Sequence, residues 1–130
     1  MTQFKALLVD DETEFVSTLA ERLGLRGVEA IVASDGFEAL ELLSQHAPPV
    51  VVLDVMMPGL GGLEVLKQIK RQRPKTQVIL LTGRGLSKDG IEGMRLGAFD
   101  YMVKPVKIEG LLEIMQDALN AANKDDSEDA

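Results

Sequence analysis

The sequence contains no cysteine and no tryptophan, and it has one histidine and one tyrosine among 130 residues. The lack of cysteine excludes a disulfide framework, a thiol nucleophile and a cysteine-ligated metal site. A single histidine, His46, excludes a histidine-rich metal centre. Basic residues are also few, 14 against 21 acidic ones, and the net charge of −7 disfavours nonspecific binding to nucleic acid.

Long hydrophobic runs are missing as well. The N-terminal stretch MTQFKALLVDD has no signal-peptide pattern, and its apolar run is too short to span a membrane. We therefore expect a soluble, cytoplasmic protein without membrane contact. We expect one domain over residues 1–122, followed at 123–130 by an acidic, disordered tail that is too short to fold into a DNA-binding or enzymatic domain.

Apolar runs alternate with helical patterns along the chain. The predicted strands are Phe4–Val9, Val28–Ser34, Val50–Asp54, Gln77–Thr82 and Phe99–Lys104. The predicted helices are 13–24, 36–47, 62–72, 87–98 and 107–122. This alternation predicts an α/β fold in which helices cover both faces of a parallel sheet through right-handed crossovers.

The helical spacing also predicts which side chains face the core. In the second helix, the side chains on the inward face are expected to be Phe37, Leu40 and, as a further candidate, Leu43. The fourth helical pattern is weaker, because Gly90 and Gly93 lie inside it and lower helix propensity.

Ligands of such folds bind outside the carboxyl ends of the strands. Functional groups gather at four of these five predicted ends: Asp10 and Asp11, Asp54, Thr82, and Lys104. Three carboxylates, one hydroxyl and one ammonium are therefore expected to converge on one edge of the sheet.

Each of these residues also has an ordinary structural explanation. Asp11 is a candidate helix N-cap, with Glu14 completing a capping-box-like pattern. Asp54 is a candidate turn former, Thr82 an ordinary strand-end residue, and Lys104 a surface charge. Their joint placement on one edge favours a shared chemistry.

Clustered carboxylates repel one another unless a cation or a proton intervenes. A hard divalent ion suits them, and Mg²⁺ prefers one or two carboxylates together with water and phosphate oxygens. One carboxylate could instead attack phosphorus and form an aspartyl phosphate. Lys104 and the Thr82 hydroxyl would then stabilise the phosphoryl oxygens, with Gly83 keeping that side open.

With Asp10-Asp11, LDVMMPGLGG, LLTG and GAFDYMVKP in this order, the chain resembles the receiver domain of bacterial two-component response regulators. The likeness runs from about residue 4 to residue 122. It implies a flavodoxin-like, doubly wound (βα)5 three-layer sandwich with strand order 2-1-3-4-5. It also implies structural roles for Pro58 and Gly62, and a cis peptide before Pro105.

The resemblance implies that Asp54 accepts a phosphoryl group from a sensor histidine kinase or a phosphotransfer protein. It further implies that Mg²⁺ (or Mn²⁺) is held by Asp10, Asp11, Asp54 and the main-chain carbonyl of Met56.

The resemblance assigns Lys104 and Thr82 to the phosphoryl oxygens. It makes Thr82 and Tyr101 the switch that reshapes the surface of the fourth helix, fifth strand and fifth helix. Such a domain is not an enzyme with an independent substrate, since it catalyses only its own phosphorylation and dephosphorylation. Its downstream protein target stays open, and so does a phosphorylation-dependent homodimer.

Other readings of the site are weaker. A haloacid-dehalogenase-like phosphatase would carry a second acid at Met56, and a flavodoxin would carry a Ser-, Thr- or Gly-rich loop where this chain has DDETE. A non-phosphorylated interaction module on the same fold remains the main alternative. The chain also fits a receiver excised from a larger regulator or hybrid kinase.

Overall fold

The computed structural model describes residues 3–57, 59–83 and 88–124. Strands and helices alternate along this part of the chain. The strands are β1 (Phe4–Val9), β2 (Val28–Ala33), β3 (Val50–Asp54), β4 (Gln77–Thr82) and β5 (Asp100–Val103). The helices are α1 (Thr13–Gly24), α2 (Gly36–His46), α3 (Gly62–Gln72), α4 (Lys88–Arg95) and α5 (Ile108–Ala122).

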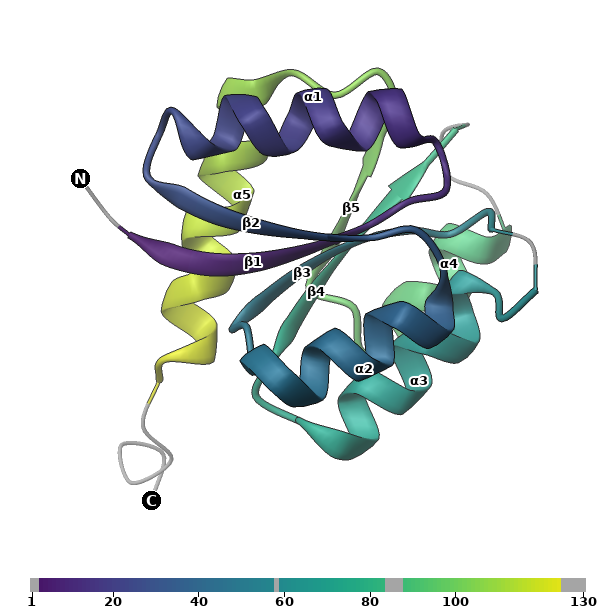
Figure 1. The fold of residues 1–130 in the computed structure, drawn as a ribbon. Coiled ribbons are helices and arrows are strands. Elements are labelled where there is room, and N and C mark those ends of the chain that lie inside the picture. The colour runs from purple at the N-terminus through teal and green to yellow at the C-terminus, as the bar shows by residue number, and fades with distance from the viewer. Residues whose placement is uncertain (1–2, 58, 84–87, 125–130) are drawn as a thin grey trace.

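The strands form one parallel sheet in the order β2-β1-β3-β4-β5, as Figure 1 shows. Every residue of the central strand β3 is buried, which explains its uninterrupted apolar run. The predicted fold class, a flavodoxin-like doubly wound sheet with order 2-1-3-4-5, is confirmed.

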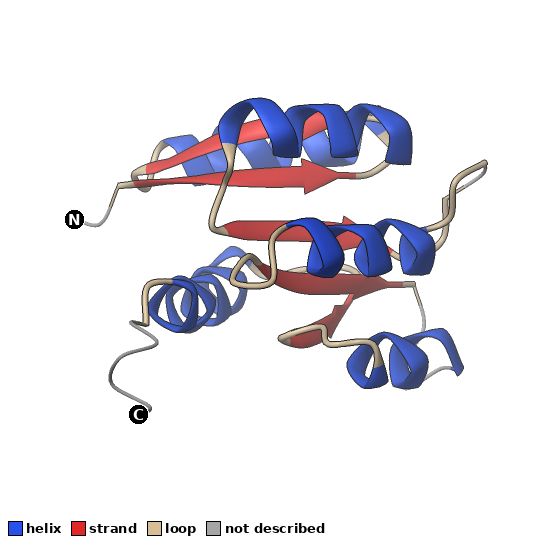
Figure 2. Ribbon diagram, turned by 90° about the horizontal axis from the view of Figure 1, so that it is seen from below, coloured by secondary structure: helices blue, strands red, loops and turns tan. Residues whose placement is uncertain are grey.

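Helices cover both faces of the sheet and make two cores (Figures 1 and 2). On one face, α1 and α5 pack on β1, β3 and β4 through residues such as Leu23 and Met115. On the other face, α2 and α3 pack through Leu43 and Leu66, and α4 lies beside β4 and β5. No helix among the described residues is both long enough and apolar enough to cross a membrane.

The predicted inward face of α2 is wrong at Phe37, whose side chain is 69% exposed. Gly36 sets the rotation of this helix, because it packs tightly against Leu60 and Val65 of the neighbouring segment. Phe37 lies about 100° further round the helix, away from the buried stripe that Ala39 and Leu43 occupy.

The predicted N-cap of α1 is also wrong. The helix begins at Thr13, and Glu12 stands at the N-cap position without a capping hydrogen bond from its side chain. Instead, Oδ1 of Asp10 accepts a hydrogen bond from the Glu12 N–H at 2.9 Å. This local turn carries the chain past Asp11 before the helix starts.

The two glycines of α4 are both buried, and Gly93 packs directly on β4. A Cβ atom at Gly93 would overlap Cδ1 of Leu80. The glycine therefore costs helix propensity but lets α4 approach the sheet closely. The helix ends at Arg95, before the predicted end at residue 98, and Gly97 follows with φ of 106°.

We expect Gly93→Ala to lower the free energy of unfolding by about 1–3 kcal/mol, because the added methyl group overpacks the contact with Leu80. The matched control is Gly24→Ala at the end of α1, where a Cβ would meet nothing within 4 Å. This control should leave stability unchanged or raise it by about 0.5–1 kcal/mol. Urea unfolding measures the free energy of unfolding of both variants. A Gly93→Ala variant as stable as Gly24→Ala would contradict the packing argument.

Candidate functional site

Four of the side chains predicted from the strand ends lie at the carboxyl edge of the sheet. Asp10 follows β1, Asp54 ends β3, Thr82 ends β4 and Lys104 follows β5. The exposed fractions of Asp10, Asp54 and Thr82 are only 1%, 4% and 3%. The main chain also joins two of these ends, since the Lys104 N–H donates to the Thr82 carbonyl at 2.8 Å.

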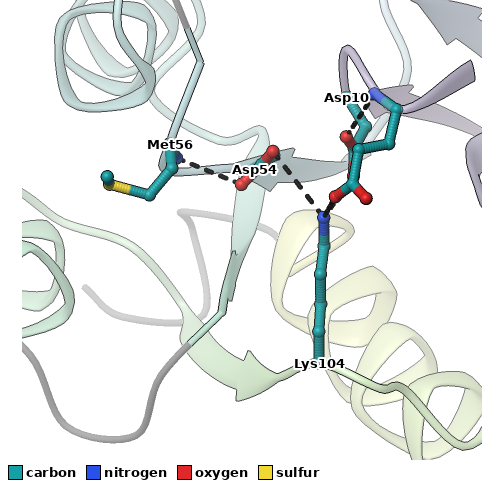
Figure 3. Close-up of polar contacts among 5 residues, drawn as sticks. Asp10, Asp54, Met56 and Lys104 are labelled. Carbon is teal, nitrogen blue, oxygen red and sulfur yellow. Dashed lines mark hydrogen bonds and ion pairs between the residues drawn. The ribbon is translucent and has the colours of Figure 1, made fainter.

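Lys104 connects the acidic groups of this edge, as Figure 3 shows for Asp10 and Asp54. Its Nζ lies 2.9 Å from Oδ2 of Asp10, 2.6 Å from Oε1 of Glu12 and 3.7 Å from Oδ2 of Asp54. The same ammonium lies 4.6 Å from the centre of the Phe15 ring, a cation–π contact.

These contacts keep Lys104 charged. Burial lowers the pKa of Lys104, but the hydrogen bonds to Glu12 and Asp10 and the charges of Asp54 and Asp10 outweigh burial and raise the pKa to about 12.

The neighbours of Asp54 fix its carboxylate in place but do not offset the effect of burial on its pKa. Its Oδ1 accepts a hydrogen bond from the Met56 N–H at 3.0 Å. Burial raises the pKa of Asp54 to about 6, and the charge of Asp10 adds to this effect against the Met56 hydrogen bond and the charge of Lys104. Asp54 is therefore harder to ionise than a free aspartate, and a further cation nearby would favour its ionised form.

The acidic groups also have the chemistry of a metal site. Carboxylate oxygens of Asp10, Glu12 and Asp54 lie within 4.8 Å of one another. Three carboxylates and one ammonium, that of Lys104, leave two formal negative charges at this edge. Oxygen donors with this charge suit a hard divalent ion such as Mg²⁺.

The structure does not bring Asp11 into this acidic group. Asp11 is exposed, and the third carboxylate that lies near those of Asp10 and Asp54 is that of Glu12. Sequence reasoning missed Glu12, for which the only signal in the sequence is a third acid after two aspartates.

The residues after Asp54 frame the site. The side chain of Met56 is 68% exposed and points away from the carboxylates in Figure 3, so only its main chain faces the site. A Cβ atom at Gly62 would lie 2.6 Å from the Asp54 carbonyl oxygen. Only glycine allows α3 to begin this close to β3. Pro58 lies outside the described residues.

Two further predicted residues lie in and next to β5. The peptide between Lys104 and Pro105 is cis. Tyr101 is partly buried and packs against the core cluster that contains Leu80, its partner on β4.

Comparison with known proteins places this geometry in a family. Residues 6–116 match the family model described as response regulator receiver domain. Among curated proteins, the chain is 42% identical over 123 residues to the "Probable transcriptional regulator ycf27" of Guillardia theta, covering 95% of this chain and 48% of that protein. It is 44% identical over 101 residues to the "Alkaline phosphatase synthesis transcriptional regulatory protein PhoP" of Bacillus subtilis, covering 78% and 42%. The chain thus spans about half the length of these relatives.

Solved structures of related proteins have the same fold. A response regulator receiver domain protein from Clostridium thermocellum superposes with a TM-score of 0.86 at 34% identity, covering 90% of this chain and 94% of that one. The chemotaxis protein CheY4 of Vibrio cholerae superposes with a TM-score of 0.84 at 31% identity, covering 90% of this chain and 99% of that one.

The fold and the acidic edge define a receiver-type signalling domain rather than a classical enzyme. The chain belongs to the response regulator receiver domain family of two-component systems. Members of this family generally bind Mg²⁺ and interact with histidine kinases.

We expect Asp54→Asn to stabilise the metal-free protein by about 1–3 kcal/mol at neutral pH, because the substitution removes a charge that burial disfavours. The pKa of Asp54 rises from 3.8 to about 6 on folding, so its ionisation costs stability as the pH rises through this interval. The difference between variant and wild type should therefore be near zero below pH 3.8 and reach its full size above about pH 6.

Urea unfolding in EDTA across this pH range tests the prediction. Asp11→Asn, which removes an exposed charge from the same loop, is the control and should change stability little. An Asp54→Asn variant that is no more stable than the wild type at neutral pH would contradict the assignment of an unfavourable buried charge.

Proposed function

We propose that this chain is a phosphorylatable receiver of a two-component phosphorelay, with Asp54 as the phosphoryl acceptor. A sensor histidine kinase or a phosphotransfer protein would supply the phosphoryl group as a phosphohistidine. The observation that carries the proposal is the buried Asp54 carboxylate, which faces Lys104 at 3.7 Å and shares an acidic edge with Asp10. Family membership supports it.

The chemistry is a direct phosphoryl transfer. A carboxylate oxygen of Asp54 attacks phosphorus, the P–N bond of the phosphohistidine breaks, and its electron pair returns to the imidazole nitrogen. The Met56 N–H holds Oδ1 of Asp54 and so fixes the orientation of the carboxylate. The Lys104 ammonium and the Thr82 hydroxyl contact the phosphoryl oxygens.

We assign Mg²⁺ (or Mn²⁺) to Asp10, Asp11, Asp54 and the carbonyl of Met56. When bound, the ion neutralises negative charge on the transferring phosphoryl group. Asp10 and Asp54 already lie together, whereas Asp11 reaches an ion only after its exposed side chain rotates inward.

The output surface is that of α4, β5 and α5, and Thr82 and Tyr101 convey the change from the acceptor to it. Exposed apolar side chains on α4 and β5 support a protein-binding role for this surface: Ile91, Met94 and Val103. The partner is a downstream protein or a second copy of the chain in the cytoplasm. Relatives named as transcriptional regulators support an output in transcription, conveyed by this domain through protein contacts rather than through nucleic acid.

Incubation with Mg²⁺ and acetyl phosphate is expected to add one phosphoryl group to the wild type and none to Asp54→Asn, as measured by intact mass. Lys104→Ala should acquire less phosphoryl than the wild type, because it lacks the cation that stabilises the transferred group. Phosphorylation of Asp54→Asn to the wild-type extent would show that another residue is the acceptor. A wild type that binds neither phosphoryl nor beryllofluoride would point to the interaction module instead.

The proposed metal ligands can be separated by calorimetric titration with Mg²⁺. Asp11→Asn should lose affinity about tenfold or more, because one charged oxygen ligand is removed. Glu12→Gln should change affinity much less, since we assign Glu12 to Lys104. A larger loss of Mg²⁺ affinity in Glu12→Gln than in Asp11→Asn would instead make Asp10, Glu12 and Asp54 the ligand set.

A further inference from the structure

Lys104 is shared unequally among its acidic neighbours. Its shortest contact, 2.6 Å, is to Glu12, followed by Asp10 at 2.9 Å and Asp54 at 3.7 Å. The side chain of Glu12 is 63% exposed, whereas those of Asp10 and Asp54 are 2% and 6% exposed. The tightest partner of Lys104 is thus a residue to which the proposed phosphoryl transfer gives no role.

We propose that Glu12 is a positioning residue that holds the Lys104 ammonium away from Asp54 in the unphosphorylated protein and competes with the phosphoryl group for it. This inference rests on the proposed function, because it concerns the same Lys104.

The geometry makes the competition direct. An ammonium has three N–H donors. The Lys104 ammonium donates two short, charge-assisted hydrogen bonds, one to Asp10 and one to Glu12, and the centre of the Phe15 ring lies 4.6 Å from it. A phosphoryl group on Asp54 brings several anionic oxygens to this edge. With two donors in use, Lys104 has one N–H left, so it can bind more than one phosphoryl oxygen only by giving up a short contact.

Burial determines which contact is given up. A carboxylate that loses its partner in the interior keeps an uncompensated charge, so Asp10 is costly to release. The Glu12 carboxylate is mostly in water and loses little when it swings away. The Glu12 main chain can stay in place meanwhile, since its N–H donates to Oδ1 of Asp10. Only the Glu12 side chain has to move.

The first readout concerns the contact itself and needs no phosphoryl group. Hydrogen exchange of the Lys104 ammonium is measured by NMR in EDTA, with the signal assigned from its loss in Lys104→Ala. Glu12→Gln should speed exchange about threefold, on the scale of an exposed ion pair. Glu14→Gln is the matched control, an exposed acid in the first turn of α1, and should leave exchange unchanged.

The second readout is the affinity for beryllofluoride, an analogue of the phosphoryl group, at a Mg²⁺ concentration that saturates each variant. Glu12→Gln should bind about threefold more tightly than the wild type, because the competing carboxylate is gone. After phosphorylation by acetyl phosphate, Glu12→Gln should also lose its phosphoryl group more slowly than the wild type. Glu14→Gln should match the wild type.

The outcomes separate the two proposals. A wild type that binds no beryllofluoride overturns the proposed function and this inference with it. Wild-type binding with equal behaviour of Glu12→Gln and Glu14→Gln overturns the inference alone. Weaker beryllofluoride binding by Glu12→Gln at saturating Mg²⁺ also overturns it, since Glu12 would then assist the bound state.

Discussion

The balance of charge between Lys104 and the buried carboxylates is the constraint on which the site depends. Folding places Asp54 beside Asp10 with almost no exposure of either side chain, which raises the free energy of the ionised form of Asp54. Lys104 offsets part of this cost, but it lies nearer Asp10 and Glu12 than Asp54. The remaining negative charge makes the edge receptive to a cation. Stability is thus reduced at the edge where the proposed function requires a reactive carboxylate.

The inner part of the sheet was predictable because its strands β1, β3 and β4 are largely buried on both faces. Such strands appear in the sequence as short apolar runs, and β1, β3 and β4 have the predicted bounds. The parallel arrangement then brings their carboxyl ends to one edge without any further information. The rotation of α2 was not predictable, because it depends on a close contact of Gly36 with Leu60 and Val65, which lie far along the chain.

The site shows the same division between local and tertiary information. Asp10, Asp54, Thr82 and Lys104 could be found from strand ends alone. Glu12 could not, because its role comes from a contact with a residue 92 positions away. The sequence shows only a third acid near a helix start, for which capping is the ordinary explanation. The structure shows that this carboxylate faces Lys104 instead of the helix N-terminus.

Tight packing connects the carboxyl edge of the sheet physically to α4. Lys104 and Thr82 are joined through their main chains, and Thr82 continues along β4 to Leu80. Leu80 pairs with Tyr101 on β5 and contacts Gly93 on α4. Because no space separates Gly93 from Leu80, a shift of β4 at this point has to be taken up by α4 or by Tyr101. A loosely packed helix with alanine-sized gaps would absorb the same shift without passing it to the surface.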